Sequence, residues 1–495
     1  MNALTAHLPA LQVIVPMLMA PFVVLLPARS LPWAAATATS LLAFAIAIQL
    51  TSIVMNGSPV TYQMGSWAAP YGIELQVDAL SALVLLIVTG ASSVALIGGR
   101  ESLAAVLSED REPYFFAAWL LALAGMAGIV VSADAFNIFV FMEISSLASY
   151  VLIAGGPDRR ALPATFKYLI MGTIGATFYL IGVGLIYMMT GTLNLADMEL
   201  RIHEVADLKP ILAAAGFITI GLALKAAMFP LHVWLPNAYT YAPHIVTAFM
   251  AACATKVSLY VLLRFDFFVF QQNLVGHGFQ FAAYLMPLAI LGILVGSAVA
   301  MFERNIKRML AFSSVAQIGY MMLGASLLTA TGLTAASLHM FNHALAKGGL
   351  FLAVAAVSMV VAGCRLDDIA GMARRMPWTF AALVIAGLSL IGIPGTAGFI
   401  SKWYLINAAL EFETGGVALV ALILVSSLMA VVYVWRIVEA AYFGEPAQEA
   451  FTPVPRALVV MLWAVAIANV GFGIAPELPL TLSATAADIL LGHVQ

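Results

Sequence analysis

The chain is poor in charged residues, and this shortage excludes whole classes of protein. Only 9% of its 495 residues are Asp, Glu, Lys or Arg, whereas soluble domains carry about 25%. Because 63% of the residues are hydrophobic, the sequence predicts a polytopic membrane protein with all-helical spans. The net charge of −3 leaves no basic surplus to neutralise phosphates, which argues against nucleic-acid binding.

Cysteines and cofactor motifs are also scarce. The two cysteines, Cys253 and Cys364, form neither a CxxC pair nor a Cys/His cluster, and we interpret them as structural thiols. The sequence has no GxxxxGK[ST] phosphate loop and no HExxH zinc motif. We therefore expect no metal and no cofactor in this chain, so any redox group or nucleotide has to lie on another protein.

Long apolar segments make up most of the sequence, and its length allows about fourteen membrane-spanning helices. The first of them lacks the basic start of a signal peptide, so we expect it to be retained as a membrane span. The expected spans cover residues 8–27, 32–55, 77–99, 114–131, 134–154, 163–189, 209–229, 243–264, 281–301, 308–330, 333–362, 378–410, 416–442 and 456–475.

Basic residues gather in alternate loops, and the positive-inside rule places these loops in the cytoplasm. They hold Arg29, Arg100, Arg111, Arg159, Arg160, Lys167, Arg304, Lys307, Arg308, Arg365, Arg374, Arg375, Arg436 and Arg456. The opposite loops hold only Arg201, Lys209 and Arg264. Both termini are therefore expected outside a bacterial inner membrane, which requires an even number of spans.

Two of the expected helices are interrupted. The seventh reaches Lys225 and then Pro230, and the twelfth carries Pro394 and Gly395 shortly before Lys402. Proline removes a backbone donor and glycine loosens a helix, and paired interruptions indicate a transporter built from repeats. Because five spans separate the breaks, we predict two inverted five-helix repeats. The expected division is 1–110 for three N-terminal helices, 111–270 and 271–445 for the repeats, and 446–495 for the last helix and tail.

Four charged residues lie deep inside these apolar segments: Glu143, Lys225, Lys256 and Lys402. A charge at the bilayer centre costs roughly 2.5–3.5 kcal/mol on insertion scales. Residues of both signs on separate helices therefore indicate a path for protons or cations. A static pair or helix cap is the structural alternative for Glu143, and snorkelling to the interface is the alternative for Lys225.

The eleventh expected span adds His339, His343 and Lys347, whose spacing of four residues places them on one helix face. Neutral histidines can pass protons between waters, because each ring both donates and accepts. Packed histidines are the alternative, and a metal site is a weaker one, since no carboxylate or thiol accompanies the pair. His232, after the seventh span, is a candidate for proton uptake. Charged residues at helix ends are expected at the membrane surface, namely Glu74, Asp78, Asp134, Lys167, Arg264, Lys307 and Arg308.

These residues resemble a known family, the antiporter-like proton-translocating subunits of respiratory complex I, membrane-bound hydrogenases and Mrp-type Na+/H+ antiporters. The matching motifs are Phe-Met-Glu143-Ile, Leu-Lys225, Phe-Pro230-Leu-His232-Val-Trp-Leu-Pro236-Asn-Ala238, Thr-Lys256, Asn305-Ile-Lys307 through Tyr320, His339-Met-Phe-Asn-His343-Ala-Leu-Ala-Lys347, and the break before Lys402. The resemblance implies two inverted repeats with a water-filled half-channel in each. It also implies roles: Glu143 and Lys225 as a gating ion pair, Lys256 as a central bridge, and Lys402 as the exit-side lysine. The residues of the eleventh span match the polar axis between bridge and exit.

Within the family, the compact length and the segment Phe-Met-Glu143-Ile-Ser-Ser-Leu-Ala-Ser-Tyr are most similar to the D-type component of Mrp antiporters. This implies a secondary transporter subunit, not an enzyme, that works with other membrane subunits and exchanges protons for monovalent cations such as Na+. One alternative is the proton-pumping subunit of a complex I-like NADH dehydrogenase or membrane-bound hydrogenase. Another is a subunit that energises a different process, such as inorganic carbon uptake.

Overall fold

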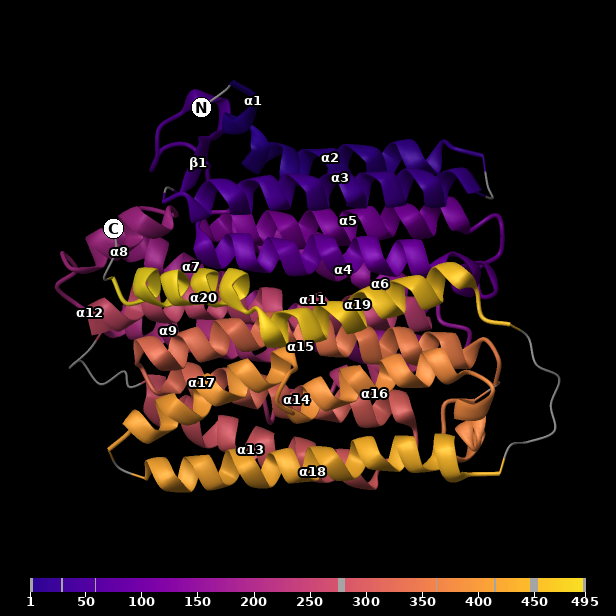
Figure 1. The fold of residues 1–495 in the computed structure, drawn as a ribbon. Helices are drawn as coiled ribbons and strands as arrows, with labels where there is room; N and C mark the ends of the chain where they lie inside the picture. The colour runs from indigo at the N-terminus through magenta and orange to yellow at the C-terminus, as the bar shows by residue number, and fades with distance from the viewer. Residues whose placement is uncertain are drawn as a thin grey trace.

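A computed structural model describes residues 3–27, 30–57, 59–274, 281–361, 363–413, 415–445 and 453–492. The long helices run side by side, and their ends gather at two opposite edges of the molecule (Figure 1). Both chain ends lie at the same edge of the molecule (Figure 1). Arg29, one of the residues used for the orientation, lies outside the described residues.

Each expected span coincides with one helix, except that the seventh ends in the break before α10 and the twelfth covers both α16 and α17. Eleven helices of the described chain are long and apolar enough to cross a membrane, and α2 and α16 are shorter apolar helices. The helices are α2 (Leu8–Val24), α3 (Ser30–Met55), α4 (Ala79–Ala104), α5 (Glu112–Val131), α6 (Ala135–Ala154), α7 (Ala161–Thr190), α9 (Lys209–Lys225) with α10 (Leu235–Tyr241), α11 (His244–Leu263), α13 (Phe281–Phe302), α14 (Ile306–Ser326), α15 (Ala330–Ser358), α16 (Pro377–Ile391) with α17 (Ala397–Glu411), α18 (Gly416–Phe443) and α19 (Arg456–Ile474). The prediction of a polytopic, helical membrane protein is confirmed, and fourteen crossings stay a prediction.

Short elements lie between and after these helices. A hairpin of β1 (Val60–Gln63) and β2 (Glu74–Val77) pairs antiparallel, with Val60 opposite Val77, and departs from the all-helical expectation. The other short elements are α1 (Ala3–Ala6), η1 (Met64–Ser66), α8 (Leu195–Ile202), η2 (Arg264–Gln271), α12 (Gln272–Leu274), η3 (Asp367–Ile369), η4 (Met372–Arg374) and α20 (Glu477–Leu490). Helix α20, the apolar tail, packs against α15 and α4 of this chain.

Polar side chains fix where several helices begin. The carboxylates of Asp78 and Asp134 accept from the backbone N–H groups of Ser81 and Asn137 at 3.0 and 2.7 Å. Such caps satisfy donors that the first helical turn leaves without partners. The surface prediction for Asp134 is only partly met, because this residue is half-buried.

The first predicted break separates α9 from α10. Helix α9 ends at Lys225, and residues 226–234, which include Pro230, are not helical. The indole of Trp234 donates to the carbonyl of Leu224 at 3.0 Å, and so satisfies one of the acceptors that the helix end leaves open.

The second predicted break separates α16 from α17 and contains Pro394. Gly392 and Gly395 have φ of +91° and +86°, in the left-handed region that glycine enters without steric cost. A Cβ at Gly392 would lie 2.7 Å from Cδ of Lys402. The break therefore needs glycine at 392 both for its backbone angle and for its distance from the lysine.

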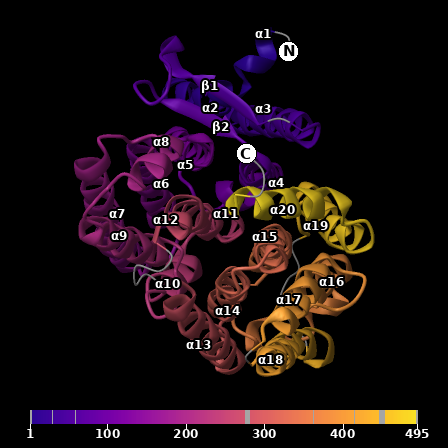
Figure 2. The same cartoon turned by 90° about the vertical axis from the view of Figure 1, so that its left-hand side faces the viewer.

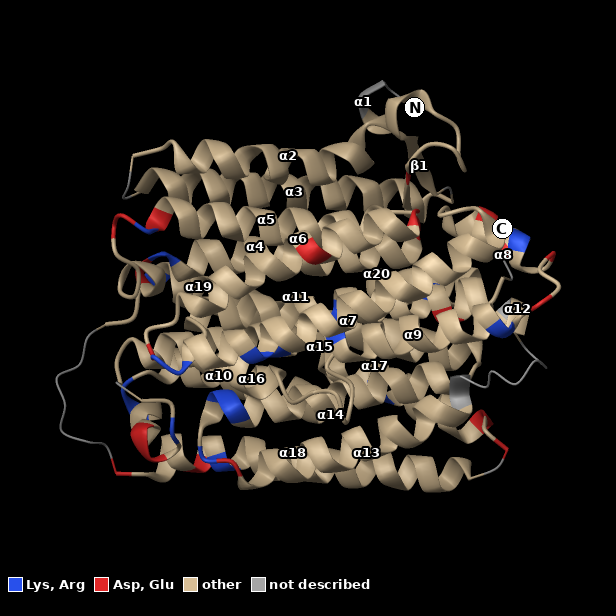
Figure 3. Cartoon of the chain, turned by 180° about the vertical axis from the view of Figure 1, so that it is seen from behind, with Lys and Arg blue, Asp and Glu red and all other residues tan. Residues whose placement is uncertain are grey.

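The central helices place the candidate residues away from lipid. Most of α11, α14 and α15 is buried, whereas only 33% of α18 and 28% of α19 is buried. Figure 2 shows the helices end-on. Helices α11, α14 and α15 lie between the earlier helices, such as α5 and α7, and the later helices α16, α17 and α18. Charged residues concentrate at the two ends of the bundle, with a few in its middle (Figure 3).

Candidate functional site

The structure brings Glu143 and Lys225 together. Nζ of Lys225, at the last position of α9, lies 3.5 Å from Oε1 of Glu143 on α6. It also donates to Oγ of Ser146 at 2.7 Å. Lys225 is 5% exposed, so this lysine does not snorkel to the interface. The position at the end of α9 adds the negative end of the helix dipole to the charge of Glu143.

A small cavity, lined by both polar and apolar side chains, adjoins Lys225. It has a volume of about 30 Å³, and roughly 10–15 Å³ suffices for one water. Lys225 and three serines of α6 form one side of it, and Ser258 of α11 contributes to the other. The serines are Ser145, Ser146 and Ser149. Water held here would connect Lys225 to the helix that carries Lys256.

Lys256 lies in the interior of the molecule, with 1% of its surface exposed. Its ammonium turns back along α11 and donates to the carbonyl of Ala251. Helix α11 packs directly on α15, the helix that carries His343 and Lys347. Lys256 therefore stands between the two halves of the chain.

The predicted stripe on α15 is buried and forms a series of contacts with α14 and α17. His339 has both ring nitrogens bonded at 2.8 Å, Nε2 to the amide oxygen of Gln317 and Nδ1 to Oγ of Ser401. The rings of His339 and His343 are parallel, with centroids 6.1 Å apart. Both nitrogens of His343 are buried without a protein partner. His339 is thus fixed in place, whereas His343 retains its full capacity to bond water.

Lys347 completes this stripe. It is fully buried, and its ammonium donates to the carbonyl of Leu310 at 2.6 Å and to Oγ of Ser313, both on α14. No carboxylate accompanies it in the described part of the chain. In the described part of the chain, no three His, Cys, Asp or Glu side chains are grouped closely enough to hold a metal ion.

Lys402 uses the backbone that the second break exposes. Its ammonium donates to the carbonyls of Ile391 and Leu390 at 2.7 and 3.3 Å, and to Oγ of Ser427 at 2.9 Å. It also lies 4.9 Å from the ring centre of Tyr320. Because α16 ends at Ile391, these carbonyls have no backbone N–H donor from a following helix turn. The ammonium of Lys402 donates to them instead.

His232 lies in the first break and is half-buried. Its ring stacks on Phe229 with centroids 5.4 Å apart, and its Nδ1 is buried without a protein partner. Sequence reasoning did not find the neutral residues that hold the charged ones, above all Ser146, Gln317 and Ser427. Serine and glutamine are common in such segments, and only the helix packing distinguishes these from the others.

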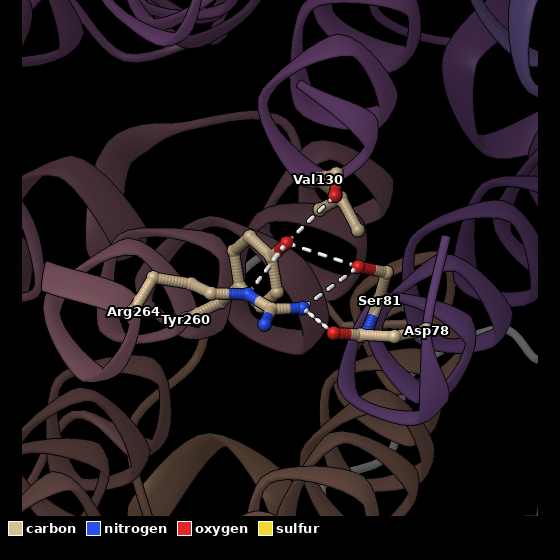
Figure 4. Close-up of polar contacts among 5 residues, drawn as sticks. All are labelled: Asp78, Ser81, Val130, Tyr260 and Arg264. Carbon is tan, nitrogen blue, oxygen red and sulfur yellow. Dashed lines mark hydrogen bonds and ion pairs between the residues drawn. The ribbon is translucent and has the colours of Figure 1, made fainter. Parts of the chain in front are cut away.

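The expectation that Asp78 and Arg264 lie at the membrane surface is wrong. Their side chains are 5% and 10% exposed and form an ion pair (Figure 4). Arg264 also donates to Oγ of Ser81 and to the hydroxyl of Tyr260, at 3.2 Å in each case. The Tyr260 hydroxyl in turn donates to the carbonyl of Val130 at 2.8 Å. The pair is tolerated because each charge neutralises the other and hydrogen bonds satisfy the rest.

Lys307 is a second exception to the surface prediction. It is 1% exposed, and its ammonium donates to the carbonyl of Ala242, directly after α10, at 2.7 Å. Its companion Arg308 pairs with Glu303 at 2.8 Å, and Lys167 is exposed. Glu74 is half-buried and accepts from the amide of Asn194 at 2.9 Å. A position at a helix end therefore did not suffice to predict exposure.

The fold and these buried charges define a polytopic membrane protein with a polar axis inside its helix bundle. A family profile described as "NADH:quinone oxidoreductase/Mrp antiporter, TM" matches residues 132–430. The chain therefore belongs to this family, which confirms the resemblance seen in the sequence.

The chain is similar to subunits of two kinds of complex. The chain is 43% identical over 459 residues to the N-type subunit of the NADH-quinone oxidoreductase of Desulforudis audaxviator, covering 91% of this chain and 90% of the relative. It is 30% identical over 400 residues to the D-type subunit of the Na+/H+ antiporter of Alkalihalophilus pseudofirmus, covering 81% and 79%.

Solved structures agree with this placement. A chain of the Mrp complex from a Dietzia species superposes with a TM-score of 0.89 at 27% identity, covering 99% of this chain and 98% of that one. A chain of an archaeal membrane-bound sulfane sulfur reductase superposes with a TM-score of 0.90 at 30% identity, covering 98% of each. Both neighbours are parts of multisubunit membrane complexes.

Proposed function

We propose that this chain is the proton-translocating subunit of a multisubunit monovalent cation/H+ antiporter, with Na+ as the cation. The observation that carries the proposal is the ion pair of Glu143 and Lys225 beside a water-sized, serine-lined cavity. The relative from a Na+/H+ antiporter and the structural neighbour in an Mrp complex support it. The chain acts as a secondary transporter subunit and not as an enzyme.

In this mechanism the charge of Glu143 controls Lys225. When the carboxylate is ionised, it holds the ammonium of Lys225 at 3.5 Å. When Glu143 takes up a proton, this attraction is lost, and Lys225 passes its own proton toward the cavity and Lys256. Burial makes the neutral amine accessible, since a desolvated ammonium without a counter-ion is costly.

The second half of the path runs from Lys256 to Lys402. The histidines of α15 transfer protons through ring nitrogens and intervening water, with His339 oriented by Gln317 and Ser401. Lys347 adds a further site, and Lys402 releases the proton beside the open end of α16. His232, with its unpaired Nδ1 in the first break, receives protons on the uptake side.

The same proposal divides the chain into inverted repeats at 111–270 and 271–445, flanked by 1–110 and 446–495. The support for this division is that both breaks place a lysine at the C-terminal end of a half-helix. Lys225 ends the half-helix α9, and the ammonium of Lys402 bonds the last carbonyls of the half-helix α16. Each repeat would therefore contain one lysine at the negative end of a half-helix.

Other membrane subunits cover the outer face of α6 in this proposal. The side chain of Glu143 is 29% exposed, and Glu143 lies near the middle of α6 (Ala135–Ala154). A charge facing lipid at this depth is costly, so a partner protein is expected to shield it. The complex is placed in a bacterial inner membrane, with both termini outside.

The test is sodium-driven proton flux in liposomes that contain the complete complex purified through this chain. Lys225→Ala should abolish the flux while the complex stays assembled. Lys209→Ala, at the exposed start of the same helix, is the matched control and should leave the flux unchanged. Normal flux in the Lys225→Ala complex would refute the proposal.

A second candidate function is the proton-pumping subunit of a redox enzyme. The 43% identity to the relative from an NADH-quinone oxidoreductase favours it. Mass spectrometry of the gently purified complex distinguishes the two. Small membrane partners without cofactors support the antiporter, whereas partners with iron–sulfur clusters or flavin support the redox enzyme.

A further inference from the structure

A second carboxylate, Asp266, lies inside the membrane-spanning part of the chain and has no role in the axis described above. It belongs to η2 (Arg264–Gln271), a π-helical segment that continues α11. Its exposed fraction is 1%. Wider π-helical turns interrupt an α-helix at an energetic cost and occur frequently at functional sites.

Asp266 has one polar partner on a neighbouring helix. The hydroxyl of Thr219, on α9, donates to Oδ1 at 3.0 Å. The other oxygen, Oδ2, is buried without a hydrogen-bond partner. Within the described chain Asp266 forms no ion pair, and the adjacent Arg264 is already bound by Asp78.

The elements around this segment carry few charges, and none of them neutralises Asp266. Helices α8, α9, α11, α12 and α20 pack against η2. The charged residues of these elements and of η2 itself are Asp197, Glu199, Arg201, Lys209, Lys225, Lys256, Arg264, Glu477 and Asp488. Not one of these described side chains forms an ion pair with Asp266.

An isolated carboxylate in such a place is costly, because nothing replaces the water around its charge. The neutral acid avoids the cost of the buried charge, and Oδ2, which accepts no hydrogen bond, is the oxygen that is free to carry the proton. The geometry thus favours a carboxyl that holds a proton on Oδ2 and accepts a hydrogen bond from Thr219 on Oδ1.

The position of Asp266 relates it to both lysines of the first half. Thr219 precedes Lys225 by six residues on α9, about 9 Å along the helix. Asp266 follows Lys256 in the continuation of α11. The segment leads toward the edge of the bundle that carries α8, α12 and both chain ends (Figure 1).

We propose that Asp266, positioned by Thr219, is an additional proton carrier that connects the Lys225 and Lys256 region with the edge of the bundle that carries the chain ends. This inference rests on the proposed proton translocation and adds a branch to its path. In the transfer the O–H bond of the acid breaks, intervening water molecules pass the proton on, and an N–H bond forms on a deprotonated lysine. The carboxylate is then reprotonated from the edge of the bundle.

The first test compares Asp266→Asn with Asp266→Glu in the reconstituted complex. Asn keeps the size and the acceptor for Thr219 but cannot carry the proton, so flux should fall at least about tenfold. Glu should restore part of it. The control is Asp207→Asn, an exposed acid just before α9, which should not alter the flux. Wild-type flux in the Asp266→Asn complex would overturn the inference, whereas absence of flux in the wild type would instead overturn the proposed function.

The second test observes the proton itself by infrared spectroscopy of the whole complex. A band of a protonated carboxyl should be present at neutral pH and absent in Asp266→Asn. Thr219→Val should move this band to higher wavenumber, because the carbonyl loses its donor. If Asp266→Asn does not assemble, the Thr219→Val shift remains decisive, and a band that does not respond to Thr219→Val would refute the inference.

Discussion

Lys225 is shared between two side chains of α6, with its ammonium 3.5 Å from Oε1 of Glu143 and 2.7 Å from Oγ of Ser146. The shorter contact is made to the neutral hydroxyl. The ammonium can therefore retain one hydrogen bond when Glu143 is neutralised. This arrangement allows the charge on Glu143 to change without a rearrangement of the helices.

We therefore predict that Glu143→Gln separates proton transport from assembly. Loss of a group that takes up and releases protons should lower the flux by about 10²-fold or more. The Ser146 contact should hold Lys225 in place, so the purified complex should keep its subunits. Flux in liposomes and native mass spectrometry measure the two effects. Glu413→Gln, an exposed acid between α17 and α18, is the control. Unchanged flux in Glu143→Gln would show that the pair is static.

Gly392→Ala should impair Lys402 without removing it. A Cβ at 392 would lie 2.7 Å from Cδ of Lys402, so the lysine has to move away from the carbonyls of Ile391 and Leu390. Gly415→Ala is a matched control, because Gly415 also has a positive φ, +92°, but a Cβ there meets no atom within 4 Å. Both variants strain the backbone, and only Gly392→Ala should lower the flux. Equal losses in the two variants would contradict a role for the position of Lys402.

Gln317→Ala should lower the flux through His339. The amide oxygen of Gln317 lies 2.8 Å from Nε2 of His339 and helps to determine which ring nitrogen carries the proton. We expect a loss of about tenfold or more in proton flux. Gln12→Ala, which removes a buried glutamine of α2 outside the axis, serves for comparison. If both variants transport like the wild type, the orientation of His339 does not limit the flux.

Arg264→Ala should destabilise the protein strongly. Removal of one member of a buried ion pair leaves the other charge without a partner, which costs about 3–5 kcal/mol. Arg201 offers the comparison, since it pairs with Asp197 at 2.8 Å near the surface, and Arg201→Ala should cost at most about 1 kcal/mol. Thermal unfolding in detergent measures both. A small effect of Arg264→Ala, with Asp78 still buried, would show that Asp78 does not need Arg264 to neutralise its charge.

The sequence predicted the helices and the main charges well, for a clear physical reason. A lysine such as Lys256 inside an apolar run is conspicuous because lipid tolerates so few charges. Glycine and proline likewise indicated the second break, where Gly392 and Gly395 adopt positive φ. Membrane helices are thus predicted from composition over about 20 residues.

The residues that sequence reasoning missed depend on contacts between distant helices. Asp78 and Arg264 lie at helix ends, where exposure is the usual outcome, and only their pairing across 186 positions allows burial. Asp266 was overlooked because it follows Arg264 near the end of an expected span. The hydroxyl of Thr219 that holds it is 47 residues away, so no local pattern connects the two.

The buried lysines outnumber the acids that face them, so the protonation of these lysines changes the net charge inside the bundle. Lys402 and Lys307 are held by backbone carbonyls and not by carboxylates, so each proton that they gain or lose changes the net charge inside the bundle. Moving one such charge across the membrane is worth about 2.3 kcal/mol per 100 mV. The axis should therefore respond to membrane voltage as well as to the two pH values on either side.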